Sequence, residues 1–251
     1  MDSVRCCVYS TGRYGEPNDG GEDQIMVSTL TVLERKENGV CVLTLNRPDK
    51  KNALSIALRD EVTDTLKGLA EDEQTKVILI TGAGNAFSAG FDLEEFAKAA
   101  QNPEFMNAIW RSGDPFHEML LKYPLPLIAA VNGAALGGGM DLAVLCDIRI
   151  AGKDAAFGHP EVQFGDVVYA PLHDLIGGAH ARDLCLTGRR IDATEALRLG
   201  LVSEVTSTKN LHSRGFEIAS EIARAPREII LRTKAKIIAR AGIEFTRTLE
   251  L

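Results

Sequence analysis

Apolar residues occur along the chain in two patterns, as short continuous runs and at near-helical spacing. The short runs that end at Gly, Asn or Pro are typical of buried strands. A longer stretch follows the potential capping residue Ser55, has apolar residues at near-helical spacing, and predicts a helix through Leu69. A final helical stretch, Ile229–Ala241, comes after Pro226. Alternating strands and helices with short connections predict an α/β fold. The predicted strands are Val40–Leu45, Val77–Thr81, Leu127–Val131 and Ile148–Ala151.

The beginning of the chain lacks this pattern. Asp, Glu, Gly, Asn and Pro crowd Gly12–Asp23 without periodicity, and no continuous apolar segment of a secretory signal follows Arg5. We therefore expect residues 1–27 to be a disordered tail, or the sequence to begin at an upstream start codon, with Met26 as the natural start. Residues 28–251 are expected to form one domain.

Two segments of the chain resemble each other. Ile78–Leu93 reads ILITGAGNAFSAGFDL and Ile128–Leu142 reads IAAVNGAALGGGMDL, so each has a strand, a Gly-Ala loop and a helix that starts near an Asp-Leu pair. Two copies of one ββα unit would explain the likeness. A glycine-rich loop before a helix allows close approach of a ligand and leaves backbone N–H groups free. Two such loops that converge could hold one oxygen in an oxyanion hole.

Other uses of these loops fit the sequence less well. A phosphate-binding P-loop needs Gly-Lys-Ser/Thr, which neither loop has. Phe87 stands where a dinucleotide-binding loop would have its third glycine. The glycines could also serve tight turns alone. Against that alternative, each glycine of Gly137–Gly139 weakens an adjoining helix by up to ~1 kcal/mol relative to Ala.

The composition of the chain indicates which classes of binding partner are disfavoured. The net charge of −7 disfavours nucleic acid and anionic membranes, and no apolar run is long enough to span a bilayer. The five cysteines are odd in number and have no zinc-site spacing, so we expect reduced thiols, no metal and a cytoplasmic location. Cys41 and Cys146 lie in apolar runs and are predicted core residues.

Five ordered motifs resemble the crotonase superfamily of enoyl-CoA hydratases and isomerases, over about residues 30 to 245. The resemblance implies a crotonase-like spiral of ββα units with a helical C-terminal region. It also implies an acyl-CoA substrate, no cofactor besides the coenzyme A of that substrate, and assembly as a homotrimer or a dimer of trimers. The motifs are LNRP with KNAL (Leu45–Leu54), FSAGFDL (Phe87–Leu93), AAVNGAALGGGMDLAVLCD (Ala129–Asp147), FGHPE (Phe157–Glu161), and LTG (Leu186–Gly188) with ALRLGLVSE (Ala196–Glu204).

The same resemblance implies roles for particular residues. The backbone N–H groups of Phe91 and Gly138 would form the oxyanion hole for the thioester carbonyl. Asp141 and Glu161 would be the two catalytic carboxylates. The residues expected to line the path of coenzyme A and the acyl group are Ala89, Phe91, Asp92, Leu93, Glu94 and Tyr169.

The chain departs from the family pattern at several of these places. Asp141 is one methylene shorter than the hydratase glutamate, and Tyr169 replaces a further aspartate of the dienoyl-CoA isomerases. Glu94 stands where hydratases often have a lysine. The segment Asp166–Gly178 is about one turn short, and the chain ends at Leu251, before the terminal helices that usually cover the site.

Several functions therefore stay open. The leading hypothesis is hydration of a 2-enoyl-CoA by both carboxylates. The alternatives are an enoyl-CoA isomerase that uses Glu161 alone and a catalytically silent acyl-CoA-binding protein. A serine protease of a related spiral fold is disfavoured because Ser88 has no evident His and Asp partners. His173 and Asp174 are expected to be an exposed pair rather than a displaced acid/base pair, and His159 a packing or hydrogen-bonding residue.

The tail hypothesis predicts that a chain beginning at Met26 unfolds at the same temperature as the full chain, because residues 1–25 lack core-forming residues. Thermal melts followed by circular dichroism test this. A melting temperature several degrees lower in the shortened chain would show that the tail packs against the domain.

Overall fold

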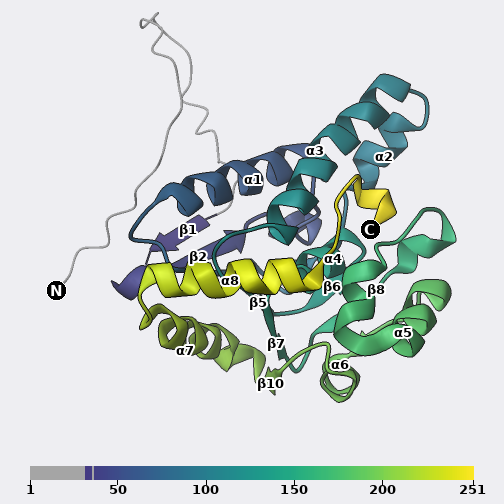
Figure 1. The fold of residues 1–251 in the computed structure, drawn as a ribbon. Helices are drawn as coiled ribbons and strands as arrows, with labels where there is room; N and C mark the ends of the chain where they lie inside the picture. Colours follow the sequence, from purple (N-terminus) through teal and green to yellow (C-terminus); the bar gives the residue numbers. More distant parts are fainter. Residues whose placement is uncertain (1–31, 36) are drawn as a thin grey trace, which may run out of the picture.

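The computed structural model describes residues 32–35 and 37–251 (Figure 1). The predicted tail over residues 1–27 lies outside the described residues, so its disorder stays a prediction. The described part is an α/β fold, as predicted. None of its helices is long and apolar enough to cross a bilayer.

A six-stranded sheet forms the base of the fold, in the order β1-β2-β3-β5-β7-β10. β1 runs antiparallel to β2, and all other neighbours are parallel. The predicted bounds of β2 and β5 are confirmed, and β3 and β7 each extend one residue further. The strands are β1 (Val32–Arg35), β2 (Val40–Leu45), β3 (Val77–Gly82), β5 (Leu127–Val131), β7 (Ile148–Gly152) and β10 (Glu204–Thr206).

A second, four-stranded sheet has the order β4-β6-β8-β9. Its first three strands are parallel and each directly follows a strand of the large sheet, whereas β9 is antiparallel to β8. The predicted ββα repeat is thereby confirmed: β3-β4-α2 and β5-β6-α4 are two copies. The elements are β4 (Ala86–Ser88), β6 (Ala134–Leu136), β8 (Ala156–Gly158), β9 (Ile191–Asp192), α2 (Leu93–Ala99) and α4 (Gly138–Val144).

The two copies differ at the start of the helix. α2 begins directly at the Asp-Leu pair, with Asp92 as its capping residue. α4 begins at Gly138, which is three residues before Asp141. The expectation that both helices start near the Asp-Leu pair is therefore refined, because in α4 the aspartate lies inside the first turn and can face the site.

The remaining helices cover the sheets. α1 begins after Ser55, whose hydroxyl accepts the Leu58 N–H as predicted, and α1 packs against α3. These helices are α1 (Ile56–Glu71), α3 (Pro103–Leu121), α5 (Ala170–Thr187), α6 (Ala193–Leu199), α7 (Leu211–Ala223) and α8 (Arg227–Ala241). The 3₁₀ turns are η1 (Glu37–Gly39), η2 (Pro48–Lys50), η3 (Pro160–Gln163), η4 (Thr208–Asn210) and η5 (Thr248–Glu250).

Both faces of the large sheet are buried, which is why its strands read as continuous apolar runs. On one face, Val42, Leu79 and Ile128 pack against Leu211 and Ala219 of α7. The alternate residues of the same strands face the other layer, in a core that continues into the second sheet. Cys41, Cys146 and Cys185 are free and buried, which confirms the prediction for the first two.

A fully buried arginine joins α1 to α3. The Arg59 guanidinium donates to the carbonyl oxygens of Leu54 and Ile109 and to Ser112 Oγ, and it lies 4.3 Å from the centroid of the Phe91 ring. Burial lowers the pKa of Arg59 to about 10, against the opposing effect of nearby carboxylates, so the side chain is still charged at neutral pH. It fixes the helix pair and the Phe91 loop together.

Replacing Arg59 with Met should lower the free energy of unfolding by at least about 2 kcal/mol, because a buried polar group left without its partner costs roughly 1–3 kcal/mol. Chemical denaturation measures this. The matched control is Arg111→Met on the exposed side of α3, which should change stability by no more than about 0.5 kcal/mol. Equal stability of the two variants would contradict the role given to Arg59.

Candidate active site

Two backbone segments converge after the parallel neighbours β4 and β6. At Gly90, a Cβ atom would lie 2.6 Å from Leu136 O and 3.2 Å from Gly138 N. At Gly138, a Cβ atom would lie 2.6 Å from Phe91 Cδ1. The two predicted N–H donors, Phe91 and Gly138, thus belong to segments in direct contact. The Gly138 N–H lies in the first turn of α4, where a helix supplies no acceptor of its own.

The two predicted carboxylates lie beside this junction. Asp141 projects from the first turn of α4, and Glu161 from η3, which follows β8. Glu161 Oε2 is 3.0 Å from the place that a Cβ atom would take at Gly137. His159 Nδ1 lies 2.8 Å from Glu161 Oε1 and 3.8 Å from Asp141 Oδ1. One imidazole therefore links both carboxylates, as expected of a hydrogen-bonding His159.

A second imidazole reaches the site from α3. His117 is fully buried, and its Nδ1 lies 3.0 Å from Gly113 O, which makes that nitrogen a donor. Its Nε2 lies 3.7 Å from Asp141 Oδ2. Sequence reasoning missed His117, because it is far from both carboxylates along the chain; the one available signal was a histidine among the apolar positions of a helix.

Several buried polar atoms at this place have no protein hydrogen-bond partner in the part of the chain the structure describes. They are Asp141 Oδ1, Glu161 Oε2, His159 Nε2 and His117 Nε2. Leaving such an atom unpaired costs roughly 1–3 kcal/mol. Proteins concentrate unpaired buried groups where they act on a ligand. The cluster therefore has the character of a reaction site.

The charges around the site favour a protonated imidazole. Burial lowers the pKa of His159, but the hydrogen bond that its Nδ1–H donates to Glu161 and the charges of both carboxylates outweigh it, so the pKa is raised above its ordinary value. The thiol of Cys185 in α5 is also close enough to both carboxylates for their charges to affect its pKa. Burial, with these charges, raises the pKa of its thiol to about 11, so it is neutral at physiological pH.

Five of the residues predicted to line the coenzyme A path lie within the short segment Ala89–Glu94. Ala89, Leu93 and Glu94 are exposed, and Phe91 is partly buried. The side chain of Asp92 has a structural role instead: it accepts the Glu94 N–H at 3.1 Å and pairs with Arg47 at 3.0 Å. Glu94 itself pairs with Lys50, which offsets the negative charge noted in the sequence. Contact with coenzyme A stays a prediction for all of these residues.

The segment around Tyr169 begins α5. The N–H of Tyr169 donates to Leu251 O at 3.2 Å, and its ring lies 5.6 Å from that of His173. The side chains of His173 and Asp174 pair with each other and are 46% and 51% exposed. The expected exposed pair is confirmed, but it lies in α5 and not in a turn. The role of Tyr169 toward the acyl group stays a prediction.

Ser88 does not form a protease triad. It is buried, and its hydroxyl donates to Asn52 O at 2.8 Å and accepts the Gly90 N–H at 3.2 Å. These bonds fix the turn before Phe91. The structure therefore supports the sequence argument against a serine protease.

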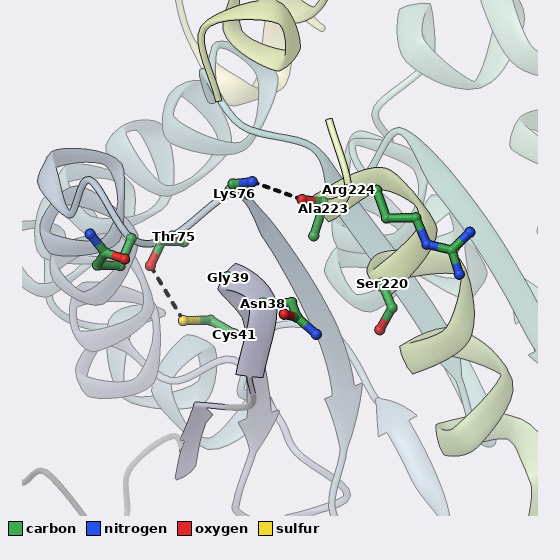
Figure 2. A pocket seen from close by; sticks show the side chains of 9 residues that line it. Asn38, Gly39, Cys41, Thr75, Lys76, Ser220, Ala223 and Arg224 are labelled. Carbon is green, nitrogen blue, oxygen red and sulfur yellow. Dashed lines mark hydrogen bonds between the residues drawn. The ribbon is translucent and has the colours of Figure 1, made fainter. Parts of the chain in front are cut away.

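A cavity of about 650 Å³ lies elsewhere, at the amino-terminal ends of β2 and β3 (Figure 2). Its lining includes Cys41, Thr75 and Arg224, and none of the predicted site residues. Lys76 in its wall donates to Ala223 O at 2.8 Å, at the end of α7. Because parallel strands carry their functional loops at the carboxyl ends, this cavity is separate from the cluster described above.

The ββα fold, the contact between the two glycine-containing loops and the pair of adjacent carboxylates together define the class of protein. The sequence profile described as enoyl-CoA hydratase/isomerase matches residues 35–250. The chain belongs to the enoyl-CoA hydratase/isomerase family, and the crotonase resemblance is confirmed.

Individual relatives agree with this assignment. The chain is 37% identical over 227 residues to a probable mitochondrial enoyl-CoA hydratase of Dictyostelium discoideum, covering 86% of this chain and 80% of that protein. It resembles the crystal structure of an enoyl-CoA hydratase from Bacillus anthracis with a TM-score of 0.80 and 35% identity, over 85% and 84% of the two chains. It also resembles the structure of a monofunctional enoyl-CoA isomerase from M. smegmatis, with a TM-score of 0.74 and 32% identity, covering 86% of this chain and 95% of that chain.

Gly138→Ala should reduce turnover of an acyl-CoA substrate by ~10²-fold or more, because the new Cβ would displace the Phe91 ring and separate the two N–H donors. Steady-state kinetics measure this, with circular dichroism to check the fold. The control is Gly68→Ala in α1, where a Cβ meets nothing within 4 Å. A folded Gly138→Ala enzyme with turnover equal to that of Gly68→Ala would contradict the predicted oxyanion hole.

Proposed function

We propose that the protein adds water to a 2-enoyl-CoA, with Asp141 and Glu161 acting on one water molecule. The observation that carries this proposal is that both carboxylates approach the same atom, His159 Nδ1, at 3.8 and 2.8 Å. Two carboxylates held this close can both reach a single small molecule. The coenzyme A of the substrate is the only cofactor that the proposal requires.

The proposed reaction moves one proton from the water to the substrate. The water oxygen attacks C3 of the enoyl group, and negative charge moves to the thioester oxygen. The N–H groups of Phe91 and Gly138 would stabilise that charge. One carboxylate accepts a proton from the water and delivers that proton to C2, while the other accepts a hydrogen bond from the same water and orients it, so the product carries both the hydroxyl and the new hydrogen. These roles agree with the buried, unpaired oxygens on both side chains.

Isomerisation by Glu161 alone is the second candidate. The Glu161 side chain is 20% exposed, against 8% for Asp141, and it lies directly against Gly137. A single carboxylate in that place could remove a proton from C2 of a 3-enoyl-CoA and return it to C4. In that case Asp141 would serve only to orient its neighbours.

We also propose assembly as a homotrimer or dimer of trimers, which the family resemblance supports. A cytoplasmic location is proposed on different grounds. Three described cysteines, Cys41, Cys146 and Cys185, are free thiols, which suits a reducing compartment.

The carboxylates separate the candidates. If the enzyme is a hydratase, Glu161→Gln and Asp141→Asn should each reduce hydration of crotonyl-CoA by ~10²-fold or more, with non-additive losses in the double variant because the pair acts as a unit. Loss of the enoyl-thioester absorbance, with mass spectrometry for the added water, measures this. Asp174→Asn is the matched control at an exposed acid and should retain wild-type turnover.

Other outcomes identify the alternatives. Conversion of 3-enoyl-CoA to 2-enoyl-CoA that is abolished by Glu161→Gln but tolerates Asp141→Asn would establish the isomerase. Binding of acyl-CoA without turnover on either substrate would indicate a silent member of the family. A fast hydratase that tolerates Glu161→Gln would overturn the proposal for both carboxylates.

A further inference from the structure

The turn between β8 and η3 places a histidine between the two carboxylates. His159 directly follows β8 and precedes Pro160, the first residue of η3, and its side chain is fully buried. The hydrogen bond from Nδ1 to Glu161 Oε1 spans only two residues of the chain. It therefore restricts the Glu161 side chain and directs the other carboxylate oxygen toward Gly137.

Among the described residues, no lysine or arginine balances the charge of this site. In the part of the chain that the structure describes, neither Asp141 nor Glu161 forms an ion pair with a lysine or arginine. The groups that face the cluster are Glu161 from η3, Asp141 from α4, His117 from α3, at 3.7 Å from Asp141, and the neutral thiol of Cys185 from α5. Two buried carboxylates close together repel each other, and an opposite charge between them relieves that repulsion.

We propose that His159 is a positioning residue that carries the positive charge between Asp141 and Glu161 and holds Glu161 against the oxyanion loop. The proposal rests on the proposed function, because it explains how both carboxylates of the reacting pair can lie in one buried site. A protonated imidazole changes the charge of this group of three from −2 to −1.

The state of the imidazole sets a pH dependence. The carboxylates raise the pKa of His159, so the side chain is charged below that raised pKa and loses its charge as the pH rises through it. Any contribution of the charge to turnover is therefore present below that raised pKa and disappears as the pH rises through it.

Two substitutions separate charge from hydrogen bonding. His159→Asn keeps a donor near the place of Nδ1 but has no charge, whereas His159→Leu has neither. At a pH below the raised pKa of His159, we expect kcat to fall about tenfold in the first variant, because an adjacent opposite charge is worth roughly one to three pKa units to an ionised carboxylate. In His159→Leu, kcat should fall by ~10²-fold or more, because the Glu161 side chain is then also free to rotate. KM should change less than kcat.

The pH profile tests the charge itself. In the wild type, kcat should decline on the alkaline side as His159 loses its proton, and in His159→Asn this decline should be absent, so that the two enzymes converge at high pH. His173→Asn is the matched control at an exposed histidine beside an acid, and it should retain the wild-type profile. A His159→Asn profile parallel to that of the wild type, or wild-type kcat in both variants, would overturn the proposal.

A readout independent of turnover separates this proposal from the proposed function. In the ¹⁵N-histidine NMR spectrum, the resonance absent from His159→Asn belongs to His159. Its titration midpoint should fall by about one pH unit or more in Glu161→Gln. A midpoint that does not move would sink the proposal even if the enzyme is a hydratase. A lowered midpoint in a protein without turnover would retain the charge coupling while the proposed function fails.

Discussion

The close approach of two backbones at Gly90 and Gly138 is the constraint on which the site depends. It leaves no room for a side chain at Gly90, whereas at Gly138 a Cβ atom would meet the Phe91 ring, and it follows from the parallel pairing of β4 with β6. The same sheet continues to β8, so the turn that carries Glu161 ends at the same edge. Three successive ββ steps thus deliver the Phe91 loop, α4 and η3 to one place. Burial of both faces of the large sheet makes that delivery rigid.

Charge is the second constraint, and it acts against burial. Carboxylates are seldom buried without a partner, and here the partners are imidazoles rather than lysine or arginine. An imidazole can give up its proton near neutral pH, whereas arginine cannot. This arrangement suits the proposed function, in which a carboxylate gains and loses a proton in each cycle. Arg59, in contrast, keeps its charge and serves only to fix the helices and the Phe91 loop.

Much of this architecture could be predicted from the sequence, because its signals are local. Apolar runs located β2 and β5, Ser55 located the start of α1, and the two similar loops indicated the ββα repeat. The family motifs identified both Asp141 and Glu161 as candidate catalytic carboxylates. The partners of these carboxylates were harder to foresee. His117 comes from α3, which no local motif connects to α4, and the structural use of the Asp92 side chain depends on its distant contact with Arg47.

The C-terminal residues show how such distant contacts support the chemistry. The N–H of Thr248 donates to Asp114 Oδ1 at 2.9 Å, and Thr248 Oγ1 lies 3.2 Å from His117 Nδ1. A few residues further on, Leu251 O accepts the N–H of Tyr169 at the start of α5. The segment therefore ties α3, which supplies an imidazole to Asp141, to the segment expected to shape the acyl pocket. Orientation of the carboxylates and shape of the pocket are then coupled through one stretch of chain, so a change in either would be felt by the other.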